Sequence, residues 1–241
     1  MILVVGATGA LGGMVARDLV SRGNGVRVLV RPGSDYGQLL ELGAQPTMGD
    51  LKDPESLARA CDGVTTVITT ANSAGRGGAD TTDSVDRSGN RALIDAARAA
   101  GVEHFIFVSA LGASEDSGAD FFRAKAETER HLAESGMSWT VLQPNLFMEV
   151  WIGMLVGVPL KQEMPVTLVG RGDRRHAMVS MRDVAAFAAA AVVHPSSRDR
   201  TIVIAGPQAH TWTEVVGLAG SVLDREIEVR YVERGEPLPG L

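Results

Sequence analysis

The sequence has few of the residues that build disulfides and metal centres. Cys61 is the only cysteine among 241 residues, which excludes an intrachain disulfide and a cysteine-rich metal site. We expect Cys61 to pack in the interior rather than to act as a nucleophile. The five histidines show no ligand-like spacing, so the sequence predicts no metal site.

Long apolar runs and an excess of basic residues are also missing. No uninterrupted apolar run reaches the length of a bilayer span, and no basic segment precedes Ile2, so we expect neither a membrane anchor nor a secretory signal. The net charge of -6 argues against a general affinity for nucleic acid or anionic lipid. These absences predict a cytoplasmic protein. The oligomeric state stays open, with a homodimer among the alternatives.

Strand-like and helix-like segments alternate along most of the chain with short connections. This alternation predicts an α/β fold with a doubly wound parallel sheet. We assign residues 1–150 to the sheet domain and residues 151–241 to a small C-terminal substrate-binding lobe, because glycines and prolines interrupt the pattern after Pro144. We expect one long helix over residues 82–100 and a strand of the lobe over residues 201–205. No further helix is expected around Pro237.

The N-terminal segment carries the most informative motif. Residues 2–5 form an apolar run typical of a buried parallel strand, three glycines follow at three-residue spacing, and a helical pattern begins directly afterwards. This context predicts a Rossmann dinucleotide-binding loop, in which backbone amides and the helix N-terminus hold a pyrophosphate. The alternative is a glycine-rich turn that binds nothing. The predicted loop residues are Gly6, Ala7, Thr8, Gly9, Ala10, Leu11 and Gly12.

The end of the second expected strand bears on the choice of nucleotide. An acidic residue there accepts hydrogen bonds from the ribose of NAD, whereas an arginine pairs with the 2′-phosphate of NADP. The strand at residues 26–30 runs into Arg31, and the first acid after it is Asp35. We therefore predict NADP, with NADPH preferred over NADH, Arg31 on the phosphate and Ser34 assisting. The alternative is an ordinary solvated arginine.

Two further strand ends complete the predicted nucleotide site. Asp50 and Leu51 follow the third strand, where Asp50 would accept from the adenine amine and Leu51 would pack on the ring. The alternative for Asp50 is a plain turn residue. Thr70, Ala71 and Asn72 end the fourth strand, and their small size would let a nicotinamide ribose approach the backbone. The alternative there is a flexible loop.

Residues 121–125 resemble the Tyr-x-x-x-Lys signature of the short-chain dehydrogenase/reductase superfamily, with Phe121 at the tyrosine position. A phenylalanine cannot protonate a carbonyl oxygen. Lys125 is one of three lysines in a chain with twenty arginines, which indicates a need for a compact ammonium group. The resemblance implies that Lys125 is catalytic and binds both hydroxyls of the nicotinamide ribose. The alternative is a solvated lysine paired with Glu129.

Other stretches narrow the resemblance to the NmrA-like branch of atypical members, which includes isoflavone-reductase-like and bacterial NADPH:quinone oxidoreductase-like proteins. These stretches are residues 6–13, 49–51, 99–102, 107–109, 125–129, 142–149 and 183–185. The branch implies that the backbone of Pro144, Asn145, Leu146 and Phe147 contacts the nicotinamide. It also implies that Phe147 lines the substrate site.

The sequence thus predicts an NADPH-dependent oxidoreductase that transfers hydride to a small flat acceptor such as a quinone. The reduced oxygen of a quinone is a weak base, which suits a site without the tyrosine. The alternative is a non-catalytic NAD(P)-binding redox sensor that acts through a protein partner. A sugar-nucleotide epimerase is disfavoured because that chemistry relies on the tyrosine. Ser109 and His176 are the remaining candidates for a proton donor.

Overall fold

The chain divides into two compact units in a computed structural model that describes residues 1–233 and 235–236. Unit 1 contains residues 1–144 and 182–204, and unit 2 contains residues 145–181 together with the chain from residue 205 onward. The segment around Pro237, where no helix was expected, lies outside the described residues.

The predicted division at residue 150 needs a correction, because residues 182–204 return to unit 1. Strand β9 (Arg200–Ile204) pairs in parallel with β6 (Ser138–Pro144), in a register that runs from Thr140 opposite Arg200 to Pro144 opposite Ile204. The strand expected in the lobe is therefore the seventh strand of the main sheet. Its backbone hydrogen bonds to β6 and the crossover helix α8 (Met181–Val193) place it there.

Unit 1 is built on a seven-stranded sheet whose neighbouring strands are all parallel. In spatial order the strands are β3 (Gln45–Met48), β2 (Val26–Val30), β1 (Ile2–Val5), β4 (Thr66–Thr69), β5 (His104–Val108), β6 and β9. The strand order reverses between β1 and β4, which is the point where doubly wound folds bind their ligands. The predicted fold class is confirmed.

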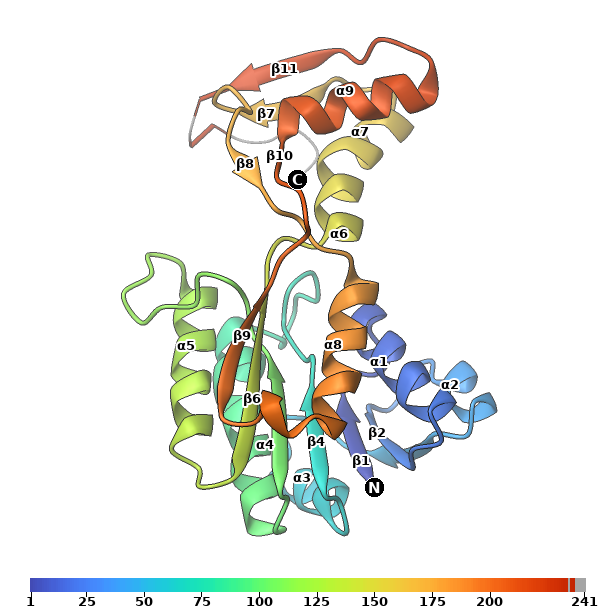
Figure 1. The fold of residues 1–241 in the computed structure, drawn as a ribbon, viewed down its shortest axis with the longest axis vertical. Helices are drawn as coiled ribbons and strands as arrows, with labels where there is room; N and C mark the ends of the chain where they lie inside the picture. The colour runs from blue at the N-terminus through green and yellow to red at the C-terminus, as the bar shows by residue number, and fades with distance from the viewer. Residues whose placement is uncertain (234, 237–241) are drawn as a thin grey trace. The chain divides into compact units, whose positions relative to one another are not determined.

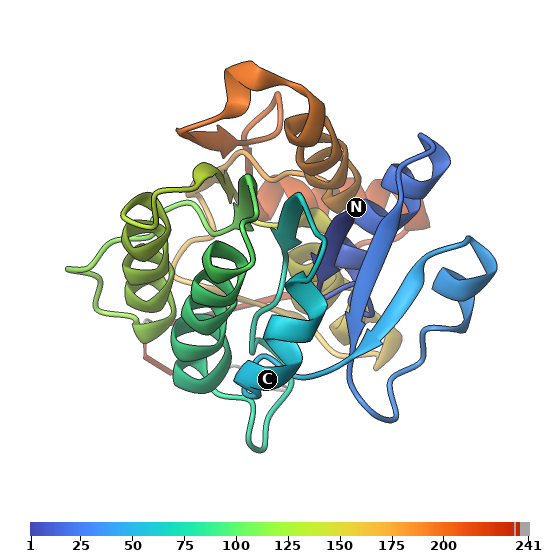
Figure 2. The ribbon, with the colours of Figure 1, turned by 90° about the horizontal axis from the view of Figure 1, so that it is seen from below.

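Helices cover both faces of this sheet (Figures 1 and 2). Figure 2 shows α1 and α8 on one face and α3, α4 and α5 on the other. The helices between the strands are α1 (Ala10–Ser21), α2 (Gly37–Glu41), α3 (Pro54–Cys61), α4 (Ser88–Ala99) and α5 (Asp120–Ala133). The helix expected over residues 82–100 is not regular: a π-helical turn, η1 (Thr82–Arg87), precedes α4. Single π-helical turns within helices occur frequently at functional sites.

One apolar core of unit 1 lies between the sheet and the helices α3, α4 and α5. Phe105 and Phe107 of β5 have no exposed surface and pack in one cluster with Leu93 and Leu132. Cys61 belongs to the same cluster, and burial raises the pKa of its thiol to about 11. The prediction that Cys61 packs in the interior is therefore confirmed.

Unit 2 is smaller and has its own apolar cluster. Its helical segments are α6 (Met148–Ile152), a π-helical turn η2 (Gly153–Gly157), α7 (Val158–Lys161) and α9 (Trp212–Leu223). Its strands are β7 (Val166–Val169), β8 (Arg175–His176), β10 (His210–Thr211) and β11 (Val229–Val232), paired as β7 with β11 and β8 with β10. The expectation that the Gly- and Pro-containing stretch after Trp151 is not one regular helix is confirmed by η2.

Candidate functional site

Two glycines at the junction of β1 and α1 are required, Gly6 by its backbone conformation and Gly12 by lack of space. Gly6 has φ +86°, in the left-handed region that side chains disfavour, and Gly9 N donates to Gly6 O at 3.0 Å. A Cβ on Gly12 would lie 2.2 Å from Gly6 O, so any side chain there would push the helix off the turn. The spacing of the glycines thus reflects the tight turn and the close helix packing that a dinucleotide loop requires.

The N-terminus of α1 is open to an anion. Thr8, Gly9 and Ala10 are exposed. The N-cap residue is Gly9, which has no side chain that could cap the helix. The first turn contains no acidic residue. The first amides of a helix have no partners within it and carry the positive end of the helix dipole. This end of α1 therefore fits the pyrophosphate of a dinucleotide.

A recess lies beside this loop at the carboxyl ends of β1, β2, β3 and β4. It brings together residues from each of these strand ends. Those predicted to bind the nucleotide are Gly6, Thr8, Arg31, Asp50, Leu51, Ala71 and Asn72. The wall also contains Val5, Leu29 and Val85, whose apolar side chains suit the flat faces of a base.

Local hydrogen bonds fix the loops that line the recess. Asp50 Oδ1 accepts from Lys52 N at 2.8 Å, so this side chain has the turn role that was its alternative, while its contact with adenine stays a prediction. Asn72 Oδ1 accepts from Ala74 N at 3.0 Å and closes a similar turn after β4. Leu51 and Ala71 are buried in the recess wall.

Three cations meet one carboxylate at this recess. Arg31 Nη1 lies 2.6 Å from Asp80 Oδ2, Arg76 Nη1 lies 3.7 Å from the same oxygen, and Lys52 Nζ contacts Asp80 Oδ1. Hydrogen bonds from Lys52 and Arg31 hold the pKa of Asp80 below its ordinary value. Arg31 is therefore half-exposed but paired, and its contact with a 2′-phosphate stays a prediction.

Lys125 is buried beneath two aromatic rings. Its Nζ lies 3.1 Å from Asp86 Oδ1, and the side chains of Lys125 and Asp86 are 3% and 0% exposed. The rings of Phe107 and Phe121 have their centroids 5.0 Å and 5.4 Å from the same nitrogen. Burial lowers the pKa of Lys125, and the charge of Asp86 acts against this shift. The alternative of a solvated Lys125 paired with Glu129 is wrong.

Glu129 has other partners. Its carboxylate accepts hydrogen bonds from Ser109 Oγ and from Gln143 Nε2, the latter at 2.9 and 3.0 Å. Ser109 comes directly after β5 and is almost completely buried. The hydroxyl of Ser109 therefore donates to a carboxylate in this structure.

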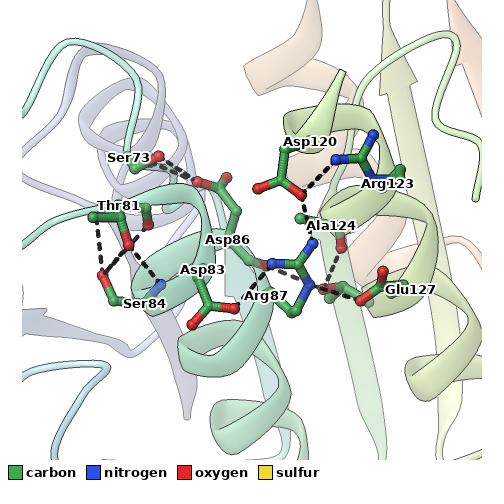
Figure 3. Close-up of polar contacts among 11 residues, drawn as sticks. Ser73, Thr81, Asp83, Ser84, Asp86, Arg87, Asp120, Arg123, Ala124 and Glu127 are labelled. Atoms are coloured by element: carbon green, nitrogen blue, oxygen red, sulfur yellow. Dashed lines mark hydrogen bonds and ion pairs between the residues drawn. The ribbon is translucent and has the colours of Figure 1, made fainter. Parts of the chain in front are cut away.

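Hydrogen bonds fix Asp86 and connect η1 to α5 (Figure 3). Ser73 N and Oγ both donate to Asp86 Oδ2, at 2.9 and 2.6 Å. The next residue of η1, Arg87, donates to Asp83, Asp120 and Glu127 at 2.8–2.9 Å and so connects η1 to α5. These bonds tie the loop after β4 to the helix that carries Lys125.

The remaining predicted residues lie at or after the end of β6. Pro144 O accepts from Leu111 N at 3.0 Å within unit 1. Asn145, Leu146 and Phe147 belong to unit 2, where Asn145 Nδ2 donates to Ala177 O at 3.0 Å and Phe147 pairs with Val179. Their contact with a nicotinamide stays a prediction.

The basic turn of unit 2 contains the other candidate proton donor. His176 lies on β8, and its ring centroid is 6.0 Å from that of Trp212. Burial and then Arg174 lower the pKa of His176. A neutral imidazole is thus favoured at neutral pH, and its part in chemistry stays a prediction.

The sequence did not predict five residues of the site: Ser73, Arg76, Asp80, Asp86 and Arg87. The sequence contained one indication of a buried acid such as Asp86, namely the position of Lys125. A lysine at a helix position that faces the core needs a buried anion. The neighbouring segment 80–87 contains three aspartates, but nothing in their spacing distinguishes the one that lies inside.

The described residues contain neither a metal cluster nor a membrane-spanning helix. Across 1–233 and 235–236, no group of three or more His, Cys, Asp or Glu side chains is arranged to hold a metal ion. In the same part of the chain, no helix has the length and apolar character needed to cross a bilayer.

The parallel sheet and the glycine loop define a dinucleotide-binding protein of the Rossmann class, and a comparison with known proteins supports this class. The NAD(P)H-binding protein family matches residues 6–195, and the chain belongs to this family, in its NmrA-like group. It is 33% identical over 232 residues to an NAD(P)H azoreductase of Xenophilus azovorans, covering 96% of this chain and 76% of that protein. It is 32% identical to the photosystem II assembly factor Ycf39 of Cyanophora paradoxa, covering 96% and 71%.

Solved structures show the same architecture. The NADPH complex of the quinone oxidoreductase QOR2 from Escherichia coli matches with a TM-score of 0.79 and 25% identity, over 97% of this chain and 78% of that one. A triphenylmethane reductase from Citrobacter matches with a TM-score of 0.81 at 22% identity, which shows the shared fold. The predicted class, an NAD(P)H-dependent reductase, is confirmed.

Proposed function

We propose that the protein uses NADPH to reduce a small, flat, electron-poor acceptor such as a quinone. One observation carries the choice of acceptor: the position of the usual tyrosine acid holds Phe121, whose ring lies 5.4 Å from Lys125 Nζ. The two tyrosines of the chain, Tyr36 and Tyr231, lie before α2 and on β11 rather than on α5. No phenol is thus available on the helix from which the signature tyrosine donates its proton.

The acceptor follows from the chemistry of the product. Reducing a simple ketone creates a strongly basic alkoxide, which needs a proton donor in the site. The reduced oxygen of a quinone is a much weaker base and takes its proton from solvent. Named relatives act on conjugated acceptors, as an azoreductase and a quinone oxidoreductase. These names support the same choice.

The chain's own residues bind and orient the nucleotide. In the proposed complex the loop of Gly6, Gly9 and Gly12 and the N-terminus of α1 hold the pyrophosphate. The recess holds the adenosine, with Arg31 on the 2′-phosphate. Bound NADPH supplies the hydride, and the contribution of the protein is orientation and exclusion of water.

Lys125 has two candidate roles, a direct contact with the nucleotide and a positioning role through its buried ion pair with Asp86. The family resemblance implies a direct contact with the nicotinamide ribose, to which the ammonium group would donate in addition to its contact with Asp86. The observed pair supports a positioning role instead, since Asp86 also binds the loop after β4 through Ser73. A direct contact predicts that Lys125→Met raises the KM for NADPH in a protein that still melts normally. A positioning role predicts loss of stability together with loss of turnover.

The acceptor class is tested by rates of NADPH oxidation with a quinone and with a simple ketone. Wild type is expected to reduce the quinone and to leave the ketone almost untouched. Phe121→Tyr places a phenol at the signature position and should raise the ratio of ketone to quinone rates. Phe122→Tyr adds the same group one residue along α5 and is the control, for which we expect no change. Efficient ketone reduction by wild type would contradict the proposal.

A second function is supported by the relatives named photosystem II assembly factor Ycf39, at 32% identity for one of them. A protein of this kind would bind the nucleotide and report through a partner protein. Phe121 is compatible with this reading as well, because a sensor needs no acid. Tight NADPH binding without oxidation by any quinone or azo compound would favour this second function over the reductase.

A further inference from the structure

The Asp80 cluster at the recess is not explained by the binding roles above. Asp80 shares its two oxygens among Arg31, Lys52 and Arg76, and its side chain is 10% exposed. Arg31, Arg76 and Asp80 all line the recess that would hold the adenosine. Lys52 is also 3.7 Å from Asp50, so the cations have two carboxylates to share.

A carboxylate in this position opposes a 2′-phosphate. The phosphate is a dianion, and its approach to Arg31 brings it close to Asp80 as well, where like charges repel. Arg31 Nη1 already donates to Asp80 at 2.6 Å, so the phosphate must compete for this donor. Hydrogen bonds from Lys52 and Arg31 lower the pKa of Asp80 and keep it charged at neutral pH.

The same carboxylate suits a ribose without the phosphate. An ionised carboxylate only accepts hydrogen bonds, and a free ribose 2′-hydroxyl is a donor. Rossmann proteins that use NAD place an acid for this purpose at the end of the second strand. Here that position is Arg31, and the only acid in direct contact with it within the described residues is Asp80, which comes from the segment after β4.

We propose that Asp80 is a specificity-determining residue that competes with the 2′-phosphate of NADPH for Arg31 and accepts from the 2′-hydroxyl of NADH. The protein therefore binds both nucleotides. Arg31 favours NADPH over NADH, and Asp80 makes this preference for NADPH smaller. The inference rests on the proposed function insofar as Arg31 binds the phosphate.

The test measures binding of the adenosine half alone, which requires no turnover. The probes are 2′,5′-ADP, which carries the 2′-phosphate, and 5′-AMP, which does not, titrated by calorimetry into the full chain. For Asp80→Asn we expect 2′,5′-ADP to bind about tenfold more tightly and 5′-AMP to bind several-fold more weakly, as for the loss of one charge-assisted contact. Asp80→Ser serves as a second variant with the same expected direction.

Asp83→Asn is the matched control. Asp83 lies three residues further along, on η1, has a 69% exposed side chain and pairs with Arg87 instead of Arg31. Asp83→Asn removes the same charge as Asp80→Asn. The ratio of the affinities for 2′,5′-ADP and 5′-AMP should stay within about twofold of the wild-type ratio, as expected for an exposed pair.

Two outcomes separate this inference from the proposed function. If 2′,5′-ADP and NADPH bind to wild type but the ratio is unchanged in both Asp80 variants, the role of Asp80 is wrong and the reductase proposal stands. If wild type binds neither 2′,5′-ADP nor NADPH, the proposed function fails, and the role of Asp80 fails with it.

Discussion

Asp80 and Asp86 lie six residues apart in the segment after β4, and each pairs with one of the chain's three lysines. Asp80 contacts Lys52 at the recess, where the side chain of Asp80 is 10% exposed and those of its three cationic partners are 31–40% exposed. Asp86 pairs with Lys125 in the interior, where both side chains are almost inaccessible to solvent. The chemistry of the two pairs is the same, and their surroundings differ.

This difference in burial assigns different tasks to the two pairs. An exposed pair contributes about 0–1 kcal/mol, so a ligand can replace one of its members at little cost. Removing one member of a buried pair leaves a charge in a medium that cannot solvate it. The Asp80 cluster can therefore exchange partners with a nucleotide, whereas the Asp86 pair belongs to the permanent scaffold beneath the site.

The largest effect is expected at the buried pair. Lys125→Met should lower the free energy of unfolding by about 3–5 kcal/mol, because Asp86 would remain buried without its counter-ion. Denaturant unfolding measures this change. Lys52→Met removes the lysine of the exposed pair and is the control, with an expected loss of less than about 1 kcal/mol. Equal losses in the two variants would remove the distinction between the pairs.

A double variant sharpens the same comparison. Replacing Asp86 by Leu in the Lys125→Met background removes the unpaired charge, so part of the lost stability should return. No recovery would show that the hydrogen bonds from Ser73 to Asp86, rather than the ion pair, hold this region together.

The next effect is expected at His104, a buried ionisable group whose side-chain hydrogen-bond partner, Thr140, is neutral. His104 Nε2 lies 2.9 Å from Thr140 Oγ1, and burial lowers the pKa of His104 to about 4. The unfolded chain takes up this proton near pH 6.5, before the folded protein does, so stability falls as the pH drops from about 6.5 to about 4. His104→Gln should reduce the dependence of the free energy of unfolding on pH in this range. An unchanged dependence would show that other groups cause it.

Arg31 gives a smaller effect, which appears in binding. Arg31→Ala should weaken NADPH binding by about 1.5–3 kcal/mol, the value of a hydrogen bond to a charged group, and should leave NADH binding almost unchanged. Fluorescence titration of the two nucleotides measures the difference. The assignment of Arg31 to the 2′-phosphate would be wrong if wild type bound NADPH and NADH equally well and Arg31→Ala changed neither affinity.

The smallest effect is the contribution of Asp80 to stability. Asp80→Asn should change the free energy of unfolding by less than about 1 kcal/mol, and added salt should reduce the change further. A loss as large as that of Lys125→Met would show that the Asp80 cluster is structural, which would argue against its exchange with a nucleotide.

The sequence predicted those parts of the structure that depend on local pattern. The loop from Gly6 to Gly12 follows from strand, glycine and helix signals that lie within twenty residues of each other. The alternation of elements predicted the parallel sheet in the same way. Neither prediction requires knowledge of which distant segments meet.

The missed features depend on contacts between distant segments. Strand β9 was assigned to the lobe because its own residues carry no mark of the partner strand β6. Asp86 meets Lys125 across 39 positions of the chain, and Arg31 meets Asp80 across 49, so neither pair is visible as spacing. The π-helical turn η1 that carries Asp86 inward also has no signature in the residues 82–87.

The most direct test of the account is a single-turnover experiment on wild type. NADPH is first titrated into the protein to establish binding, and a quinone is then mixed with the complex while the absorbance of NADPH is followed. We predict saturable binding and then a loss of the bound NADPH that is much faster than in the mixture without protein. Saturable binding with no acceleration by any quinone would contradict the reductase and favour a nucleotide sensor. Absence of binding would contradict the assignment of the loop and the recess.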